Sequence, residues 1–446
     1  MATRADDPTA EATELLQDLI RNQCVNDGTV ESGGEARSVD LLNGYLAGSG
    51  LDVERYEPKP GRASLVARIE GSDPTAPSLL LMGHTDVVPV NPDGWSRDPF
   101  GAEVVDGFVW GRGAVDMLNE TATMAVAFRR LADSGFKPKG TLSYLAVADE
   151  EALGTWGARH LVENERDAVY ADYVITESGG FQMPTPEGPR LPVMTDEKGT
   201  YWSKLTVKGT PGHGSQPFRT DNALVTAAEV VRRIAEYRPE TYIGETWRGF
   251  VEGMQYPPEF ADSLLKADDL REFCETLPLG MARVAYACTH TTFAPTVIHG
   301  GTKTNVIPDR VELQVDIRTL PGQTAQEVDA LLADALGDLA DRVEIESNDD
   351  PSTASPTDTP LWECLERVSG RLVEGSALVP FVMVGGTDNR YFRRAGSVGY
   401  GFGLFSRRLG FEDYATMFHG NDERVDIESL ALCTDLWDAV ARDLLG

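Results

Sequence analysis

The first 195 residues alternate short apolar runs with amphipathic segments. Segment 117–131 places Met124, Phe128 and Leu131 at helical spacing, which predicts a helix with one apolar face. Three apolar runs have the length and composition of buried strands, at residues 79–83, 144–148 and 173–176. Strands that alternate with helices are typical of a doubly wound, mostly parallel α/β sheet that helices cover on both faces.

The pattern changes after residue 195. The predicted strands here are residues 201–207, 284–298, 311–319 and 342–347, and the predicted helices are residues 222–237 and 325–336. This order indicates an inserted α+β layer. Residues 350–357 then have the composition of a loop and mark the return to the first domain. We therefore expect one domain from residues 1–195 and 353–446, and a second from residues 196–352.

The first apolar run ends in a histidine and an acid, His84 and Asp86. Alternate residues of a strand share a face, so the two side chains point the same way. A metal-bound imidazole commonly has a carboxylate on its other ring nitrogen, which fixes the tautomer. A histidine at a strand end that only pairs with a neighbouring acid would have the same pattern. The pair alone does not distinguish these two hypotheses.

Acidic residues follow the other predicted strands or the glycine loop before the predicted helix. They are Asp116, Glu150, Glu151 and Glu177. The carboxyl ends of parallel strands meet at one edge of an α/β sheet, so we expect these acids to converge with His84. A second histidine, His419, lies in a turn-like segment near the C-terminus.

Four carboxylates in one crevice need compensating charge, because an unpaired buried carboxylate costs several kcal/mol. Two divalent cations would balance the four acids. Mixed imidazole and carboxylate ligands suit zinc better than calcium or magnesium, which prefer shells of oxygen alone. We therefore expect two divalent metal ions, with zinc favoured and cobalt or manganese as alternatives.

Further motifs accompany these residues along nearly the whole chain. The full set occupies residues 83–89, 111–117, 149–151, 176–177, 209–217, 300–308, 316–318, 385–388 and 418–420. In this order the motifs resemble the dizinc exopeptidase and amidohydrolase family that includes aminoacylases, glutamate carboxypeptidase and succinyl-diaminopimelate desuccinylase. The segments around Asn305 and His419, with the long segment between residues 238 and 290, look most like its carboxypeptidase S branch.

The resemblance implies a role for each matching residue. It assigns His84 and Glu177 to one zinc ion and Glu151 and His419 to the other. Asp116 is then the ligand that bridges the two ions.

The resemblance also assigns residues outside the metal shell. Glu150 matches the general base, and Asp86 matches the residue that supports His84. His213 matches a residue that acts across a dimer. The substrate-binding residues that the resemblance implies are Asn305, Arg318, Gly386 and Thr387. The α+β layer becomes a ferredoxin-like lid through which two copies form a homodimer.

The activity implied is cleavage of an amide bond beside a free carboxylate. The favoured substrate is an N-acyl amino acid, and the alternative is a dipeptide cleaved by a dipeptidase or carboxypeptidase. A non-catalytic metal-bound scaffold is a competing hypothesis, which Glu150 disfavours because a base that is no ligand has little structural purpose. A dinuclear phosphoesterase is disfavoured because only Arg318 is placed to meet an anion.

Composition limits the partners and the compartment. With 71 acidic and 40 basic residues the net charge is −31, so we expect neither nucleic acid nor an anionic membrane as a partner. An anionic substrate then needs a local cation. The first residues contain no apolar signal segment, and no run of 18 apolar residues occurs. The five cysteines lack metal-ligand spacing, which favours a reducing, cytoplasmic location.

Overall fold

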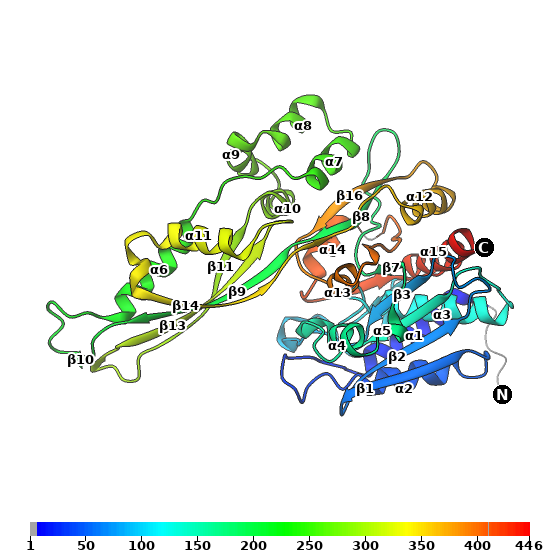
Figure 1. Ribbon diagram of the computed structural model, residues 1–446, viewed down its shortest axis with the longest axis horizontal. Helices are drawn as coiled ribbons and strands as arrows, with labels where there is room; N and C mark the ends of the chain where they lie inside the picture. The colour runs from blue at the N-terminus through cyan, green and yellow to red at the C-terminus, as the bar shows by residue number, and fades with distance from the viewer. Residues whose placement is uncertain (1–6, 409) are drawn as a thin grey trace.

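The computed structural model describes residues 7–408 and 410–446, so the first six residues of the N-terminal segment and Leu409 lie outside the description. The chain forms a broad lobe around a nine-stranded sheet and a narrow lobe around a four-stranded sheet (Figure 1). Among the described residues, no helix combines the length and apolarity needed to cross a lipid bilayer.

The sheet of the broad lobe is mixed and has a parallel centre. Its strands, in spatial order, are β1 (Asp52–Lys59), β2 (Arg62–Ile69), β6 (Leu142–Val147), β3 (Leu79–His84), β7 (Tyr173–Thr176), β17 (Val398–Gly401), β8 (Arg190–Glu197) and β15 (Thr353–Ala354), and β16 (Ala377–Met383) also pairs with β8. The parallel pairs β6–β3, β3–β7 and β7–β17 form the centre. A fourth parallel pair joins β8 to β16. The predicted α/β class is therefore confirmed, in a sheet that combines parallel and antiparallel pairs.

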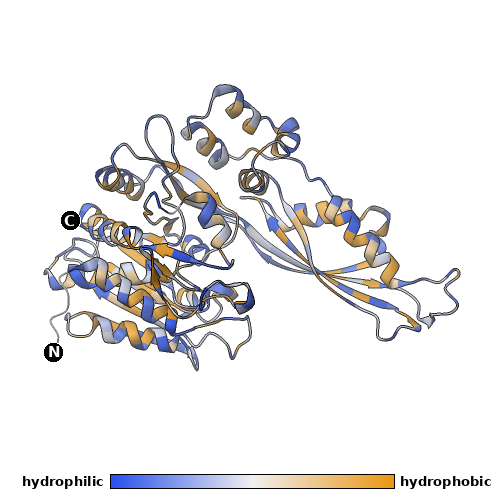
Figure 2. Cartoon of the chain, turned by 180° about the vertical axis from the view of Figure 1, so that it is seen from behind, coloured by the Kyte–Doolittle hydropathy of each residue, from blue (hydrophilic) through white to orange (hydrophobic). Residues whose placement is uncertain are grey.

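Helices cover both faces of this sheet because successive side chains of a strand point to opposite sides. In β3, Leu79 and Leu81 belong to the core that includes α1 (Pro8–Arg21), α3 (Leu118–Asp133), α12 (Pro360–Leu372) and α15 (Ile427–Leu445). Leu80 and Met82 belong to the opposite core, with α4 (Ala158–Asn164) and α13 (Asn389–Arg394). The central strands are largely hydrophobic, whereas the helices alternate hydrophobic and hydrophilic positions (Figure 2).

The narrow lobe is antiparallel throughout. Its sheet has the order β11 (Thr292–Gly300), β13 (Arg310–Thr319), β9 (Gly199–Lys208) and β14 (Val343–Asp350). The helices α6 (Ala223–Glu236) and α11 (Ala325–Leu336) share an apolar core with these strands. The resulting order of strands and helices is ferredoxin-like. A short ladder of β10 (Gly212–His213) and β12 (Val306–Ile307) forms the far tip (Figure 1).

Four helices between α6 and β11 share one apolar core with β8 and β16 of the broad lobe. We call α7 (Glu245–Gly253), α8 (Pro258–Leu265), α9 (Leu270–Cys274) and α10 (Leu279–Thr289) the outer helices. Their apolar core includes Trp247 and Phe250 and joins Phe381 of β16. The predicted strand 284–298 is wrong over residues 284–289, which belong to α10. Valine, tyrosine and cysteine suggested a strand there, but Ala285 and Cys288 are buried at helical spacing.

Two adjacent chain crossings connect the two sheets. Lys198 alone separates β8 from β9, and residues 351–352 separate β14 from β15. The strands β15 and β8 are paired, so the crossings lie side by side. Helix α13 holds both crossings: Arg393 pairs with Glu197 at 3.1 Å and Arg390 with Asp350 at 3.3 Å.

Candidate active site

Three adjacent parallel strands supply most of the site. His84 is the last residue of β3, and Glu177 directly follows β7. Glu150 and Glu151 lie in the short turn that follows β6. Because β6, β3 and β7 are parallel neighbours, their carboxyl ends place these side chains at one edge of the sheet. Asp116 comes from the loop that leads into α3.

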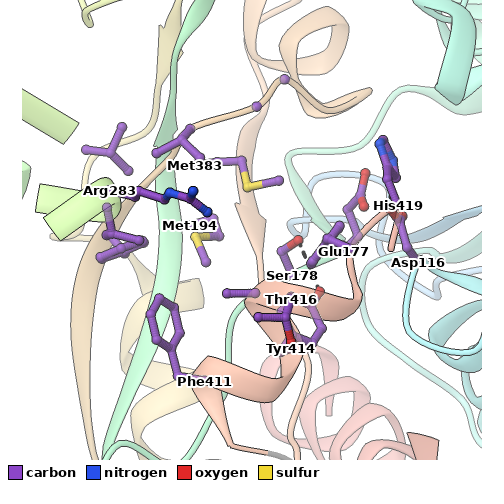
Figure 3. Close-up of a pocket in the computed structure, with 18 of the residues that line it drawn as sticks. Asp116, Glu177, Ser178, Met194, Arg283, Met383, Phe411, Tyr414, Thr416 and His419 are labelled. Carbon is purple, nitrogen blue, oxygen red and sulfur yellow. Dashed lines mark hydrogen bonds and ion pairs between the residues drawn. The ribbon is translucent and has the colours of Figure 1, made fainter. Parts of the chain in front are cut away.

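Four of these side chains and His419 form two groups with metal-ligand geometry. His84, Asp116 and Glu177 form one group, and Asp116, Glu151 and His419 form the other. Within each group, one ligand atom per residue lies within 4.8 Å of the others. Asp116 shares its carboxylate between the groups: Oδ1 lies 3.2 Å from Nε2 of His84, and Oδ2 lies 3.2 Å from Nε2 of His419. Figure 3 shows Asp116 beside His419.

The electrostatics of these groups fit divalent cations. Burial and then the neighbouring acids raise the pKa of Glu151 and Glu177 above the usual range. Burial opposes protonation of His84, but Asp116 and Glu177 outweigh it and raise the pKa of His84 well above its usual value. Oε1 of Glu151 is buried with no hydrogen-bond partner among the described residues. Excess negative charge and an unpaired carboxylate oxygen are what bound cations would relieve.

Asp86 supports the site differently from the expectation. His84 Nδ1 donates to the main-chain carbonyl of Asp86 at 2.9 Å, while the Asp86 carboxylate lies farther away, at 3.7 Å. That carboxylate accepts hydrogen bonds from Asn26 at 2.8 Å and from the amides of Glu150 and Glu151 at 3.2 Å. The carbonyl therefore leaves Nε2 of His84 free as a ligand atom, and the carboxylate fixes the turn that carries the two glutamates.

Glu423 holds the Asp116 loop, and sequence reasoning missed it. Its buried carboxylate accepts hydrogen bonds from the amides of Val115 at 2.8 Å and Asp116 at 3.1 Å. It also accepts from the amide of Gly113 at 3.0 Å and pairs with Arg112 at 2.7 Å. Its position near His419 in the sequence gave no signal, because the loop that it holds lies about 300 residues earlier.

Backbone strain also marks the site. Asp149, Ser178 and His419 have left-handed φ angles of 71°, 75° and 54°. Such conformations cost about 1–3 kcal/mol each and persist where the surroundings fix them. Asp149 is fixed by an ion pair with buried Arg62, which also pairs with Glu35 at 2.8 Å. Asp149 precedes Glu150, Ser178 follows Glu177, and His419 is itself a member of the site. The strained backbone therefore lies where these side chains are oriented toward one another.

Glu150 lies beside the metal-ligand groups and belongs to neither. Its side chain is 10% exposed and lines the cavity described below. Burial raises the pKa of Glu150 well above its usual value. Arg390 Nη2 lies 3.8 Å from its carboxylate. A carboxylate with a raised pKa is a stronger base than an ordinary carboxylate, which suits a group that accepts a proton.

The predicted substrate-binding residues and His213 lie in different parts of the molecule. Gly386 and Arg318 line the same cavity, and Arg318 is paired with Asp316 through two contacts of 2.8 and 3.2 Å. Thr387 is turned away: its amide and hydroxyl donate to Glu197 at 2.6 and 3.2 Å, so it supports a chain crossing.

His213 and Asn305 lie far from the metal-ligand groups of the same chain. Both are exposed at the β10–β12 tip of the narrow lobe (Figure 1). His213 Nδ1 lies 2.7 Å from the hydroxyl of Ser215, and the carbonyl of Asn305 accepts a hydrogen bond from the amide of Gly214 at 2.8 Å. One chain by itself therefore does not bring these two side chains to the site.

A cavity of about 720 Å³ opens from the metal-ligand groups toward the outer helices (Figure 3). Asp116, Glu151, Glu177 and His419 lie at one end. Most of the remaining wall is apolar and is formed by Phe181, Met194, Leu279, Val284, Phe381, Val382, Met383, Phe411, Tyr414 and Phe418. The aromatic residues Trp247 and Phe250 of α7 do not line it and serve the core of the outer helices.

Comparison with known proteins gives concordant matches. The model of "Peptidase family M20/M25/M40" matches residues 80–443. The chain is 29% identical over 384 residues to N-fatty-acyl-amino acid synthase/hydrolase PM20D1 of Xenopus tropicalis, covering 84% of this chain and 74% of that protein. It is 28% identical over 382 residues to aminoacylase-1 of Homo sapiens, covering 84% and 82%.

A solved structure matches the fold over its full length. The M20 family metallo-carboxypeptidase Sso-CP2 of Sulfolobus solfataricus aligns with a TM-score of 0.74 at 17% sequence identity. The alignment covers 99% of each chain, so both lobes have counterparts in that protein.

The role of Glu423 gives a direct test of how the Asp116 loop is held. Glu423→Gln places an amide NH₂ group against main-chain N–H donors, so the loop should shift and zinc affinity should fall by about 10–100-fold. Zinc affinity is measured by competition with a chelator. Glu428→Gln removes the same charge from an exposed position nearby and is the control. Unchanged zinc affinity in Glu423→Gln would show that the loop does not depend on this carboxylate.

Proposed function

The chain belongs to peptidase family M20/M25/M40, and on this premise we propose that it is a dinuclear metal-dependent hydrolase of N-acyl amino acids. The observation that carries the proposal is the pair of ligand groups that share Asp116, beside Glu150, at one end of an apolar cavity. Relatives named as N-fatty-acyl-amino acid synthase/hydrolase and aminoacylase-1 support the same substrate class.

The ligands of the two ions follow from the two groups. His84 and Glu177 would hold one ion, Glu151 and His419 the other, and Asp116 both. Imidazole and carboxylate together favour zinc, with cobalt or manganese as alternatives. Such ions supply Lewis acidity, which lowers the pKa of water and polarises a carbonyl oxygen.

Glu150 would move the proton. Its carboxylate takes a proton from the attacking water and returns it to the amine nitrogen as the amide bond breaks. A raised pKa suits both steps, because the group must accept the proton and then release it near neutral pH. Asp86 holds the backbone of Glu150 and Glu151 and so keeps the base and the ligand in fixed relation.

The cavity favours an acyl substrate. A wall of phenylalanine, methionine, leucine and valine side chains suits a hydrocarbon chain better than the polar backbone of a dipeptide. Dipeptide or carboxypeptidase activity at the same metal groups is the alternative. A non-catalytic scaffold fits less well, because Glu150 is no ligand and yet faces the cavity. Arg318, together with Gly386, is the predicted site for the carboxylate of the amino acid.

We further propose that residues 1–195 and 353–446 act as the catalytic domain and residues 196–352 as a lid that forms a homodimer. Exposed apolar side chains support a partner surface on the narrow lobe: Val225 is 67% exposed, Leu224 47% and Ile298 48%. A second copy would bring His213 and Asn305 of its tip to the metal groups of the first.

The substrate class is tested with N-decanoyl and N-acetyl amino acids, their amides and a set of dipeptides, assayed with added zinc, cobalt or manganese. We expect N-decanoyl amino acids to give the highest kcat/KM and their amides to be cleaved at least tenfold more slowly. Equal cleavage of acids and amides would point to an aminopeptidase. Preference for dipeptides would support the alternative activity.

The adjacent glutamates separate catalysis from metal binding. Glu150→Gln should retain both metal ions and lose about 10²–10⁴-fold in kcat, because the amide cannot take a proton. Glu151→Gln should lose metal, since an amide is a much poorer ligand. Elemental analysis and turnover are measured on both proteins. Equal metal loss in the two variants would contradict this division of roles.

Mixed dimers test whether His213 acts on the partner. His213→Ala and Glu150→Gln should each be inactive alone. After subunit exchange, hybrid dimers contain one complete site, so the mixture should recover about a quarter of wild-type activity. Exchange is checked by native mass spectrometry with differently tagged subunits. Exchange without recovered activity would exclude this arrangement.

A further inference from the structure

Arg283 is a cation that faces the cavity without a partner. It extends from α10 into the cavity, where its guanidinium lies beside Met194 and Met383 (Figure 3). Among the described residues it makes no hydrogen bond and no ion pair within 4.0 Å. The chain has 71 acidic residues for 40 basic ones, so an arginine without an acidic partner is conspicuous here.

The two other arginines of the cavity are already compensated. Arg318 binds both oxygens of Asp316 at 2.8 and 3.2 Å. Arg390 pairs with Asp350 at 3.3 Å and lies 3.8 Å from Glu150. A substrate anion that approached either guanidinium would also meet the existing carboxylate. Arg283 therefore offers the cavity an uncompensated positive charge.

The packing of α10 fixes the direction of Arg283. Ala285 and Cys288 bury one face of the helix in the core of the outer helices. Leu279, Gly280 and Arg283 all line the cavity, as expected for residues one turn apart on one face. The guanidinium lies across the cavity from Glu177 and His419 (Figure 3). One ligand could therefore contact the metal-ligand groups and Arg283 together.

We propose that Arg283 binds a carboxylate of the substrate across the cavity from the metal-ligand groups. A guanidinium can give a carboxylate two parallel hydrogen bonds. The identity of the substrate rests on the proposed function, whereas carboxylate binding at Arg283 does not. The carboxylate comes either from the amino-acid half of the substrate or from the far end of a dicarboxylic acyl chain.

Binding without turnover tests the proposal first. Decanoate and decanol share a chain that fits the apolar wall and differ in the carboxylate, and their affinities are measured by calorimetry on the full-length, metal-loaded protein. Arg283→Gln should weaken decanoate binding about tenfold or more and leave decanol within about twofold. Any contribution of the metal ions is common to wild type and variant. Arg283→Lys should recover only part of the loss.

A matched control excludes a general effect of charge. Arg248 of α7 is exposed, lies in the same outer helices and does not line the cavity. Arg248→Gln removes the same charge and should leave both affinities unchanged. The proposal is overturned if Arg283→Gln binds decanoate as tightly as the wild type. It is also overturned if both ligands are weakened equally, which would indicate a damaged wall.

Kinetics identify the source of the carboxylate. The substrates are an N-decanoyl amino acid, its amide, and the amide of an N-(ω-carboxydecanoyl) amino acid. Arg283→Gln should raise KM about tenfold for the first alone or for the third alone, according to which carboxylate Arg283 binds. No change in KM for any of them excludes the role of Arg283 in substrate binding.

Arg318 and the proposed function are separated in the same assay. If Arg318→Gln raises KM for the N-decanoyl amino acid and Arg283→Gln does not, Arg318 binds that carboxylate. If the wild type cleaves none of the three substrates, the proposed function fails. The decanoate affinities then still decide whether Arg283 is a carboxylate site.

Discussion

Repulsion between buried carboxylates is the constraint on which the site depends. Asp116, Glu151 and Glu177 have side chains no more than 7% exposed, and each acid raises the cost of ionising its neighbours. Only backbone held independently of these charges can keep them together. The hydrogen-bonded centre of the sheet provides this support for Glu177, and Asp86 and Glu423 provide it for the two loops through main-chain amides.

The residues that hold the two loops are different from the acids that the loops carry, and they come from distant parts of the chain. A carboxylate that accepts several amide hydrogen bonds fixes the backbone around it without binding a metal. Asp86 and Glu423 are such carboxylates, and each fixes a loop whose own acids must stay free as ligands. The acids of the metal-ligand groups and the two supporting acids therefore have the same functional group and differ in what they face.

The sequence predicted the parts of the molecule that local pattern controls. The three apolar runs became β3, β6 and β7, and the helical spacing after Met117 became α3, because burial on both faces and one apolar stripe leave clear periodicities. Residues 284–289 were misassigned because α10 is short and rich in residues that favour strands. The ferredoxin-like order of the narrow lobe was anticipated from the resemblance together with the strand pattern.

Other parts of the site depend on tertiary contacts that no local pattern carries. The carboxylate of Asp86 was expected on His84, yet its position is set by two amides of the turn after β6. Thr387 belongs to a motif that suggested substrate binding, but its amide and hydroxyl both donate hydrogen bonds to Glu197. Glu423 and Arg283 gave no signal, because their roles depend on tertiary neighbours. Glu423 faces the Asp116 loop and Arg283 faces the cavity.

The two adjacent crossings form a narrow hinge between the two sheets. Lys198 lies at one hinge point, and its amino group holds the end of α10 through the carbonyls of Ala287 at 2.8 Å and His290 at 2.7 Å. The outer helices are therefore held against β8 and β16 of the broad lobe. A small rotation of the narrow lobe would move its tip farthest. Of the cavity wall it would move Trp202 of β9 and Arg318 of β13, and it would leave the apolar part formed by β8, β16 and α10 in place. In the proposed dimer, the tip can therefore move while the apolar part of the cavity wall stays in place.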